Sequence, residues 1–109
     1  MKKQTETDRH GERRRKVAWQ LTVIGANIRK IRKEKGLSQE QLADRSCLEW
    51  RSVQRFEKGK NNILTTTMLR LLATLGCRFE DVTAGAADGD WEKREKEAGK
   101  TRSKKREVR

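Results

Sequence analysis

The chain has 109 residues, about the length of one domain, and its 28 Lys and Arg against 16 Asp and Glu give a net charge of +12. Its apolar stretches are far shorter than the roughly 20 residues of a membrane-spanning helix, and its N-terminal segment lacks the apolar core of a secretory signal. Membrane and secreted proteins are therefore excluded, and we expect a cytoplasmic protein with a polyanionic partner.

Apolar residues are concentrated in the middle of the chain. Nearly every Ile, Leu, Val and Phe falls within residues 17–83, which predicts one folded domain there, preceded by a charged arm over residues 1–16. Residues 84–109 begin with a flexible linker rich in Gly and Ala and continue as a basic tail that we expect to be disordered or a frayed helix. The basic groups of this tail make it a candidate contact for DNA, and the alternatives are a solubilising tail and a tail that binds a protein partner. Trp91 is isolated in this polar segment, which favours a partner.

The first predicted helix carries an apolar stripe whose members are three or four residues apart, namely Val17, Leu21, Ile24, Ile28 and Ile31. Gly36 ends this helix, and Leu37 folds back over its end. Gly25 lies inside the stripe, where a glycine costs about 1 kcal/mol relative to alanine. We therefore expect the helix to begin properly only near Gly25.

A second, short helix is predicted after this glycine stop. Ser38 and Gln41 have the spacing of a capping box, in which each side chain bonds to the backbone of the other residue at a helix start. The helix is expected to run through Arg45 and to be followed by a turn over residues 46–48.

The third predicted helix covers residues 49–57 and is ended by Gly59. Its apolar side chains, Val53 and Phe56, are three residues apart and therefore share the buried face. Two short helices joined by a turn of three or four residues are the elements of a helix-turn-helix.

The fourth predicted helix begins at the threonines that start with Thr65, which we expect to act as caps, and it ends at Gly76. Its apolar residues repeat at helical spacing and are Met68, Leu71, Leu72 and Leu75. A short fifth element follows over residues 79–82. These elements predict an all-α fold, a compact bundle of about five helices flanked by charged arms.

Catalytic and metal-binding groups are scarce. His10 is the single histidine and lies in the charged arm, and the sequence has no Tyr and no nucleophile or phosphate-loop motif. Cys47 and Cys77 are too few for a disulfide scaffold or a metal cluster, so we expect two reduced, partly buried thiols. The protein is predicted not to be an enzyme, and no cofactor or metal is expected.

Residues 24–82 resemble the DNA-binding domain of the lambda-repressor-like, or XRE, family. The segments that carry the resemblance are IGANIRKIRKEKGLSQEQLA, RSVQRFEKGKNN, MLRLLATLG and FEDV. The specific part is the combination of GLSQEQLA with a following helix that ends in FEKGK. The resemblance implies that the third predicted helix enters the major groove of double-stranded DNA.

The resemblance also implies which side chains read bases. Trp50, Arg51 and Arg55 match the base-reading positions, and Gln54 is close to them. Arginine suits this role because its planar fork can donate to guanine O6 and N7 together. Trp50 fits two interpretations equally, packing against the turn or contact with bases.

Other positions match contacts to the DNA backbone or a structural role. Gln39, at the start of the second predicted helix, matches a phosphate-contacting position. Lys58 and Lys60 are expected backbone contacts. Arg32 and Glu57 match a structural ion pair that joins the first helix to the end of the third.

This sequence departs from the family pattern at a few positions. Cys47 stands where the family usually has Gly, so the turn is expected to be strained or less left-handed. Glu49 stands where a Ser or Thr cap is common, and its charge suits a helix start but would repel a phosphate. Ile63 replaces a common Pro. Phe79 and Val82 are candidates for the core or for a dimer seam.

The function that these observations favour is a sequence-specific transcriptional regulator, a homodimer on an inverted-repeat operator that is associated with the nucleoid when bound. Two alternatives use the same domain: an antitoxin whose tail binds a toxin, and a controller of a restriction–modification operon. A non-specific nucleic-acid-binding protein is a further class, distinguished by affinity that hardly varies with sequence.

Overall fold

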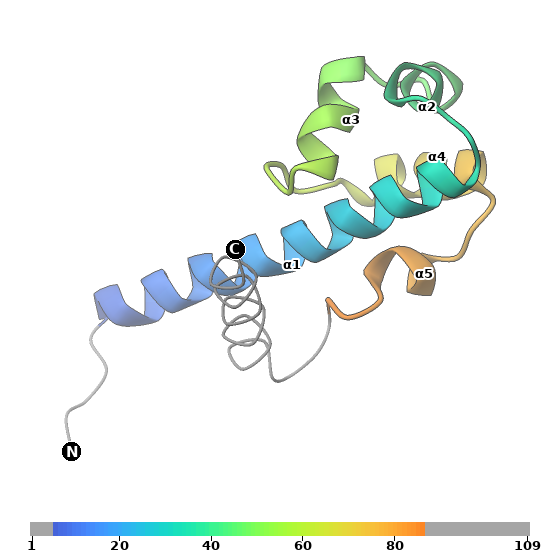
Figure 1. The fold of residues 1–109 in the computed structure, drawn as a ribbon. Coiled ribbons are helices and arrows are strands. Elements are labelled where there is room, and N and C mark those ends of the chain that lie inside the picture. The colour runs from blue at the N-terminus through green and yellow to red at the C-terminus, as the bar shows by residue number, and fades with distance from the viewer. Residues whose placement is uncertain (1–5, 87–109) are drawn as a thin grey trace, which may run out of the picture.

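The computed structural model describes residues 6–86, which form five α-helices and no strand (Figure 1). The helices are α1 (Glu6–Glu34), α2 (Gln39–Arg45), α3 (Trp50–Glu57), α4 (Thr65–Leu75) and α5 (Phe79–Thr83). The prediction of an all-α bundle of about five helices is confirmed. The tail from residue 87 onward, with Trp91, lies outside the described residues.

Helix α1 is much longer than expected. It begins at Glu6 and not near Gly25, so the prediction of a late start is wrong, and residues 6–16 of the predicted arm are helical. The Arg, Lys and Glu residues of this segment are good helix formers, and no proline interrupts them. In Figure 1 the first turns of α1 project beyond the other four helices.

Gly25 has a tertiary role that explains its place inside a helix. A Cβ built on Gly25 would lie 2.2 Å from the carbonyl oxygen of Phe56 and 2.8 Å from that of Glu57. Only a residue without a side chain allows α1 to touch the last turn of α3. Gly25 therefore lowers the helix propensity of α1 but permits the close contact between α1 and α3.

Local signals set the ends of the short helices. The N–H of Leu37 donates to the carbonyl of Arg32 (3.1 Å), and Gly36 has a φ of 71°, as predicted for a glycine stop. The capping box is also confirmed: Gln41 N–H donates to Ser38 Oγ (3.0 Å), and Ser38 N–H donates to Gln41 Oε1 (2.9 Å). The expected threonine caps are wrong, because α4 begins at Thr65 itself with Leu64 before it and no side-chain cap bond.

Cys47 ends α2 as a glycine would. Its φ is 56°, and the N–H of Leu48 donates to the carbonyl of Ala43 (2.8 Å) to close the turn. The turn is left-handed, so of the two expected alternatives, a strained turn or a less left-handed one, the first holds, and the strain falls on the Cys47 backbone.

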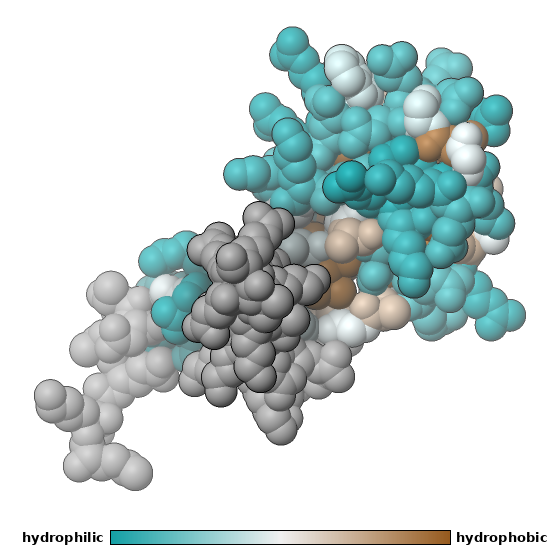
Figure 2. Space-filling view, viewed as in Figure 1, coloured by the Kyte–Doolittle hydropathy of each residue, from teal (hydrophilic) through white to brown (hydrophobic). Residues whose placement is uncertain are grey.

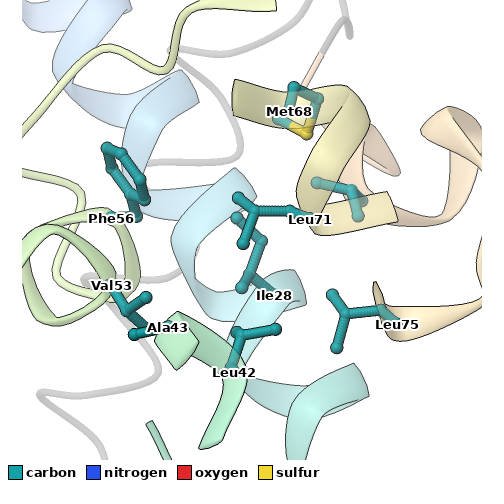
Figure 3. Packing of buried hydrophobic residues seen from close by; sticks show 9 residues of the cluster. Ile28, Leu42, Ala43, Val53, Phe56, Met68, Leu71 and Leu75 are labelled. Carbon is teal, nitrogen blue, oxygen red and sulfur yellow. The ribbon is translucent and has the colours of Figure 1, made fainter. Parts of the chain in front are cut away.

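The hydrophobic core lies between α1 and the other helices (Figure 3). It consists of Ile28, Leu42, Ala43, Val53, Phe56, Met68, Leu71, Leu75 and Val82. The inward side of α3 is thus as predicted. Val82 is fully buried and therefore belongs to the core. Phe79 is 54% exposed and stays a candidate for a dimer seam. The Asn27 amide of α1 holds α5 by donating to the carbonyls of Val82 (2.8 Å) and Ala84 (3.0 Å).

None of the helices within residues 6–86 is both long enough and apolar enough to cross a lipid bilayer.

Candidate nucleic-acid interface

The outer face of α3 carries the predicted base-reading residues. Arg51 and Arg55 are four residues apart, one helical turn, and both are exposed. Val53 and Phe56 point to the opposite side, into the core. Core packing therefore determines which face of α3 is free, and this face presents two guanidinium groups to solvent.

The N-terminal end of α3 is exposed and has no side-chain cap. Trp50, its first residue, is 46% exposed, and the preceding Glu49 makes no side-chain hydrogen bond to the helix start. Gln54, one turn after Trp50, is half-buried. An aromatic side chain half-exposed at the leading end of this helix is available for contact with a ligand.

An ion pair joins α1 to the end of α3, and the resemblance had pointed to these two residues. Arg32 Nε donates to Glu57 Oε2 (2.6 Å), and Arg32 Nη2 donates to Glu57 Oε1 (2.9 Å). The side chains are only 9% and 3% exposed. Arg32 Nη1 also donates to the carbonyl of Leu37 (2.8 Å), so one guanidinium holds the end of α1 and the end of α3.

Gln39 belongs to the same hydrogen-bond cluster. Its Nε2 donates to Glu57 Oε1 over 3.1 Å, an arrangement that the sequence did not predict. A side-chain amide has two N–H groups, so this bond leaves one for another acceptor. The bond fixes the orientation of Gln39 at the start of α2 and leaves it half-buried.

These residues line a cleft of about 460 Å³ between α1, the start of α2 and the end of α3. Its lining residues are Arg29, Arg32, Ser38, Gln39, Glu57 and Lys58. Arg29 was not predicted from the sequence as a site residue. Its position three residues before Arg32, on the same side of the helix, was the signal that could have identified it.

The structure thus divides the predicted site residues into two groups. Gln39, Lys58 and the ion pair share the cleft, while Trp50, Arg51, Gln54 and Arg55 lie along α3 outside it. Lys60 is exposed in the loop after α3, where its own N–H closes the helix on the carbonyl of Arg55 (2.9 Å). Figure 2 shows a largely hydrophilic surface over α2 and α3.

The two cysteines are free and differ in environment. Cys47 is exposed, which corrects the expectation that both are partly buried, while Cys77 is half-buried. Burial raises the pKa of the Cys77 thiol, and the nearby Asp81 carboxylate raises that pKa further. Among residues 6–86 no group of three or more His, Cys, Asp or Glu side chains is placed to hold a metal ion.

Comparison with known proteins agrees with this architecture. Two HTH-type transcriptional regulators of Sinorhizobium fredii are similar in sequence. One, y4dJ, is 33% identical over 54 residues, which are 50% of this chain and 70% of that protein. The other, y4mF, is 36% identical over 62 residues, which are 57% of this chain and 82% of that protein.

A solved structure and a family model point the same way. The restriction-modification controller protein C.AhdI from Aeromonas hydrophila has a TM-score of 0.56 and 34% identity, covering 57% of this chain and 94% of that one. The model of the helix-turn-helix family matches residues 28–82, half of the chain. The chain therefore belongs to the helix-turn-helix family of XRE, lambda-repressor-like DNA-binding transcriptional regulators, which are not enzymes.

Proposed function

We propose that this protein is a sequence-specific transcriptional regulator that binds an inverted-repeat operator as a homodimer, with α3 in the major groove. The free face of α3 carries the proposal, because Arg51 and Arg55 are exposed on a helix whose other face is locked in the core. The buried Arg32–Glu57 pair keeps the end of that helix rigid against α1.

Binding selection on randomised DNA tests base reading. Arg51→Ala and Arg55→Ala should each relax preference at one operator position and cost about 1–3 kcal/mol of binding free energy, as expected for loss of a bidentate contact to guanine. Arg78→Ala is the matched control, since Arg78 is an exposed arginine that precedes α5. Unchanged preference in both α3 variants would remove the base-reading role.

We assign contacts with the DNA backbone to the cleft beside α3. Gln39 has one amide N–H free of Glu57, and Lys58 and Arg29 bring two positive charges to the same cleft. A phosphate there would accept charge-assisted hydrogen bonds. Lys58→Ala should weaken binding to all sequences alike and reduce the salt dependence by about 0.9 in the log–log slope.

The homodimer is assigned to an apolar groove formed by α1, α4, α5 and the loop before α4. Two adjoining hollows of about 240 and 350 Å³ share Leu21, Ile24 and Phe79 in their lining. Leu69 and Phe79 are 59% and 54% exposed at this groove. In Figure 2 hydrophobic residues gather over the middle of α1 and α5. An exposed apolar surface of this kind is typical of protein–protein contacts.

A charged residue introduced into the groove tests whether the groove forms the dimer interface. Leu69→Lys should convert dimer to monomer in analytical ultracentrifugation and abolish cooperative binding to two half-sites, which a two-fold dimer places about 34 Å apart or a multiple of that. Leu64→Lys is the control, because Leu64 is 74% exposed and does not line the groove. A single, non-palindromic footprint with one bound chain would refute the dimer.

A narrower role, control of restriction–modification genes, is favoured by the similarity to C.AhdI over 94% of that chain. Mapping the bound positions across the genome of the native host separates the two roles. Sites confined to the promoters of restriction and modification genes would support the controller. Sites elsewhere would support a regulator of other genes.

A further inference from the structure

The first half of α1 is a basic helix that the DNA-binding role described above does not use. Its exposed basic residues are Arg9, Arg13, Arg14, Arg15 and Lys16. Figure 1 shows this part of α1 extending beyond the other helices, so it adds little to the core. Residues 6–16 carry these five cations against Glu6, Asp8 and Glu12, a net charge of +2, and the positive groups are concentrated over residues 13–16.

Two close contacts fix how this rod is rotated relative to α3. Gly25 faces the backbone of Phe56, and a Cβ built on Gly59 would lie 2.8 Å from Cα and N of Thr22. Thr22 and Gly25 therefore mark the side of α1 that faces the end of α3 and the loop that carries Lys60. Any residue earlier in α1 on this side points the same way.

Helical geometry places Arg14 and Arg15 on that side. At about 100° per residue, Arg14 is within about 20° of Gly25, three turns away, and Arg15 is within about 20° of Thr22, two turns away. Arg13 and Lys16 are about 120° and 180° from Gly25 on the same count, and therefore point elsewhere. The four residues are consecutive but form two groups with different orientations.

Arg15 follows Thr22 along the side of α1 that faces the end of α3, where contacts with the DNA backbone are proposed. Arg15 lies about 10 Å beyond Thr22 along the helix axis, and its side chain leans toward the N-terminal end of α1, as side chains on a helix do. On this side of the molecule the exposed cations Lys58 and Lys60 are followed, after about two turns of α1, by the exposed Arg15 and Arg14. Phosphates follow one another along a DNA strand, so a second row of cations in this position meets the backbone next to the half-site.

We infer that the first half of α1 is a second DNA-binding element, in which Arg14 and Arg15 bind backbone phosphates that flank the half-site. The inference rests on the proposed insertion of α3 into the major groove. Guanidinium groups suit it because they donate two parallel hydrogen bonds to a phosphate. The element increases affinity and lengthens the footprint, and it reads no bases.

The test compares two double variants of the full chain that each remove two positive charges. Arg14→Ala/Arg15→Ala should reduce the log–log salt dependence of DNA binding by about 1.8, and affinity by tenfold or more near about 0.1 M salt. Arg13→Ala/Lys16→Ala should leave the slope nearly unchanged. Alanine favours helix, so circular dichroism should show α1 intact in both.

Duplex length gives a second readout. With about six base pairs of flanking DNA the Arg14→Ala/Arg15→Ala variant should bind more weakly than wild type, whereas on a duplex trimmed to the half-site the two should bind equally. Equal slopes for both double variants, or a difference that persists on the trimmed duplex, would overturn the inference. If the wild type showed no sequence preference, the proposed function would be overturned instead. The log–log salt dependence of the two double variants on random DNA would still show whether the α1 element binds phosphates.

Discussion

Arg32 of α1 and Glu57, the last residue of α3, form a two-pronged ion pair with N–O distances of 2.6 and 2.9 Å. The residues are 25 positions apart in the chain, and Gln39 at the start of α2 donates to the same carboxylate. One buried carboxylate thus holds three helices in the arrangement that presents α3.

Removing one partner of this pair should be strongly destabilising. Arg32→Ala leaves the Glu57 carboxylate buried with a single neutral donor, and we expect the free energy of unfolding to fall by about 3–5 kcal/mol. The neighbouring exposed residue provides the control, since Lys33→Ala should change it by less than about 0.5 kcal/mol. Urea denaturation followed by circular dichroism makes the comparison, and equal stabilities would show that the pair does not hold the fold.

Gly25→Ala should disrupt the contact between α1 and α3. The new methyl group would overlap the carbonyl oxygen of Phe56, which is backbone and cannot move aside cheaply. We expect a loss of about 2 kcal/mol or more, as for overpacked cores. Gly11→Ala is the same change in the same helix, where the Cβ meets only Arg14 Nη2 at 4.0 Å, and it should stabilise by up to about 1 kcal/mol. Similar effects for the two would argue against the close contact.

Cys47→Gly should stabilise the protein. A non-glycine residue in the left-handed region costs roughly 1–2 kcal/mol, and part of this is offset because glycine loses more backbone entropy on folding. We expect a net gain of about 1 kcal/mol in thermal or urea unfolding. Cys47→Ala keeps the Cβ and should change stability little. If the alanine variant gained as much, the thiol and not the backbone conformation would be the cause.

The two thiols should react with maleimide at different rates. Cys47 is exposed, whereas Cys77 is half-buried and has a raised pKa. A raised pKa lowers the fraction of reactive thiolate at any pH below it, so the rate at Cys77 should rise only at higher pH. Mass spectrometry of peptides after a short pulse at pH 8 should find Cys47 modified first. The preference should vanish in denaturant, and faster reaction of native Cys77 would contradict the assigned environments.

Sequence by itself determined the features whose causes are local. The capping box of Ser38 and Gln41 and the stop at Gly36 involve partners at most five residues apart, so their spacing is visible in the chain. The buried face of α3 followed from the three-residue spacing of Val53 and Phe56. Knowing that face was enough to predict that Arg51 is free, because side chains on a helix occupy defined angular positions.

Tertiary structure decided the rest, because contacts between distant helices depend on how the helices pack. Gly25 reads as a helix breaker on its own, yet it is the point at which α1 touches α3. The bond of Gln39 to Glu57 and the place of Arg29 in the cleft likewise exist only once three helices have met. Glycine at position 25 costs about 1 kcal/mol of helix propensity relative to alanine. This cost is outweighed because the methyl group of an alanine would overlap the backbone carbonyl of Phe56.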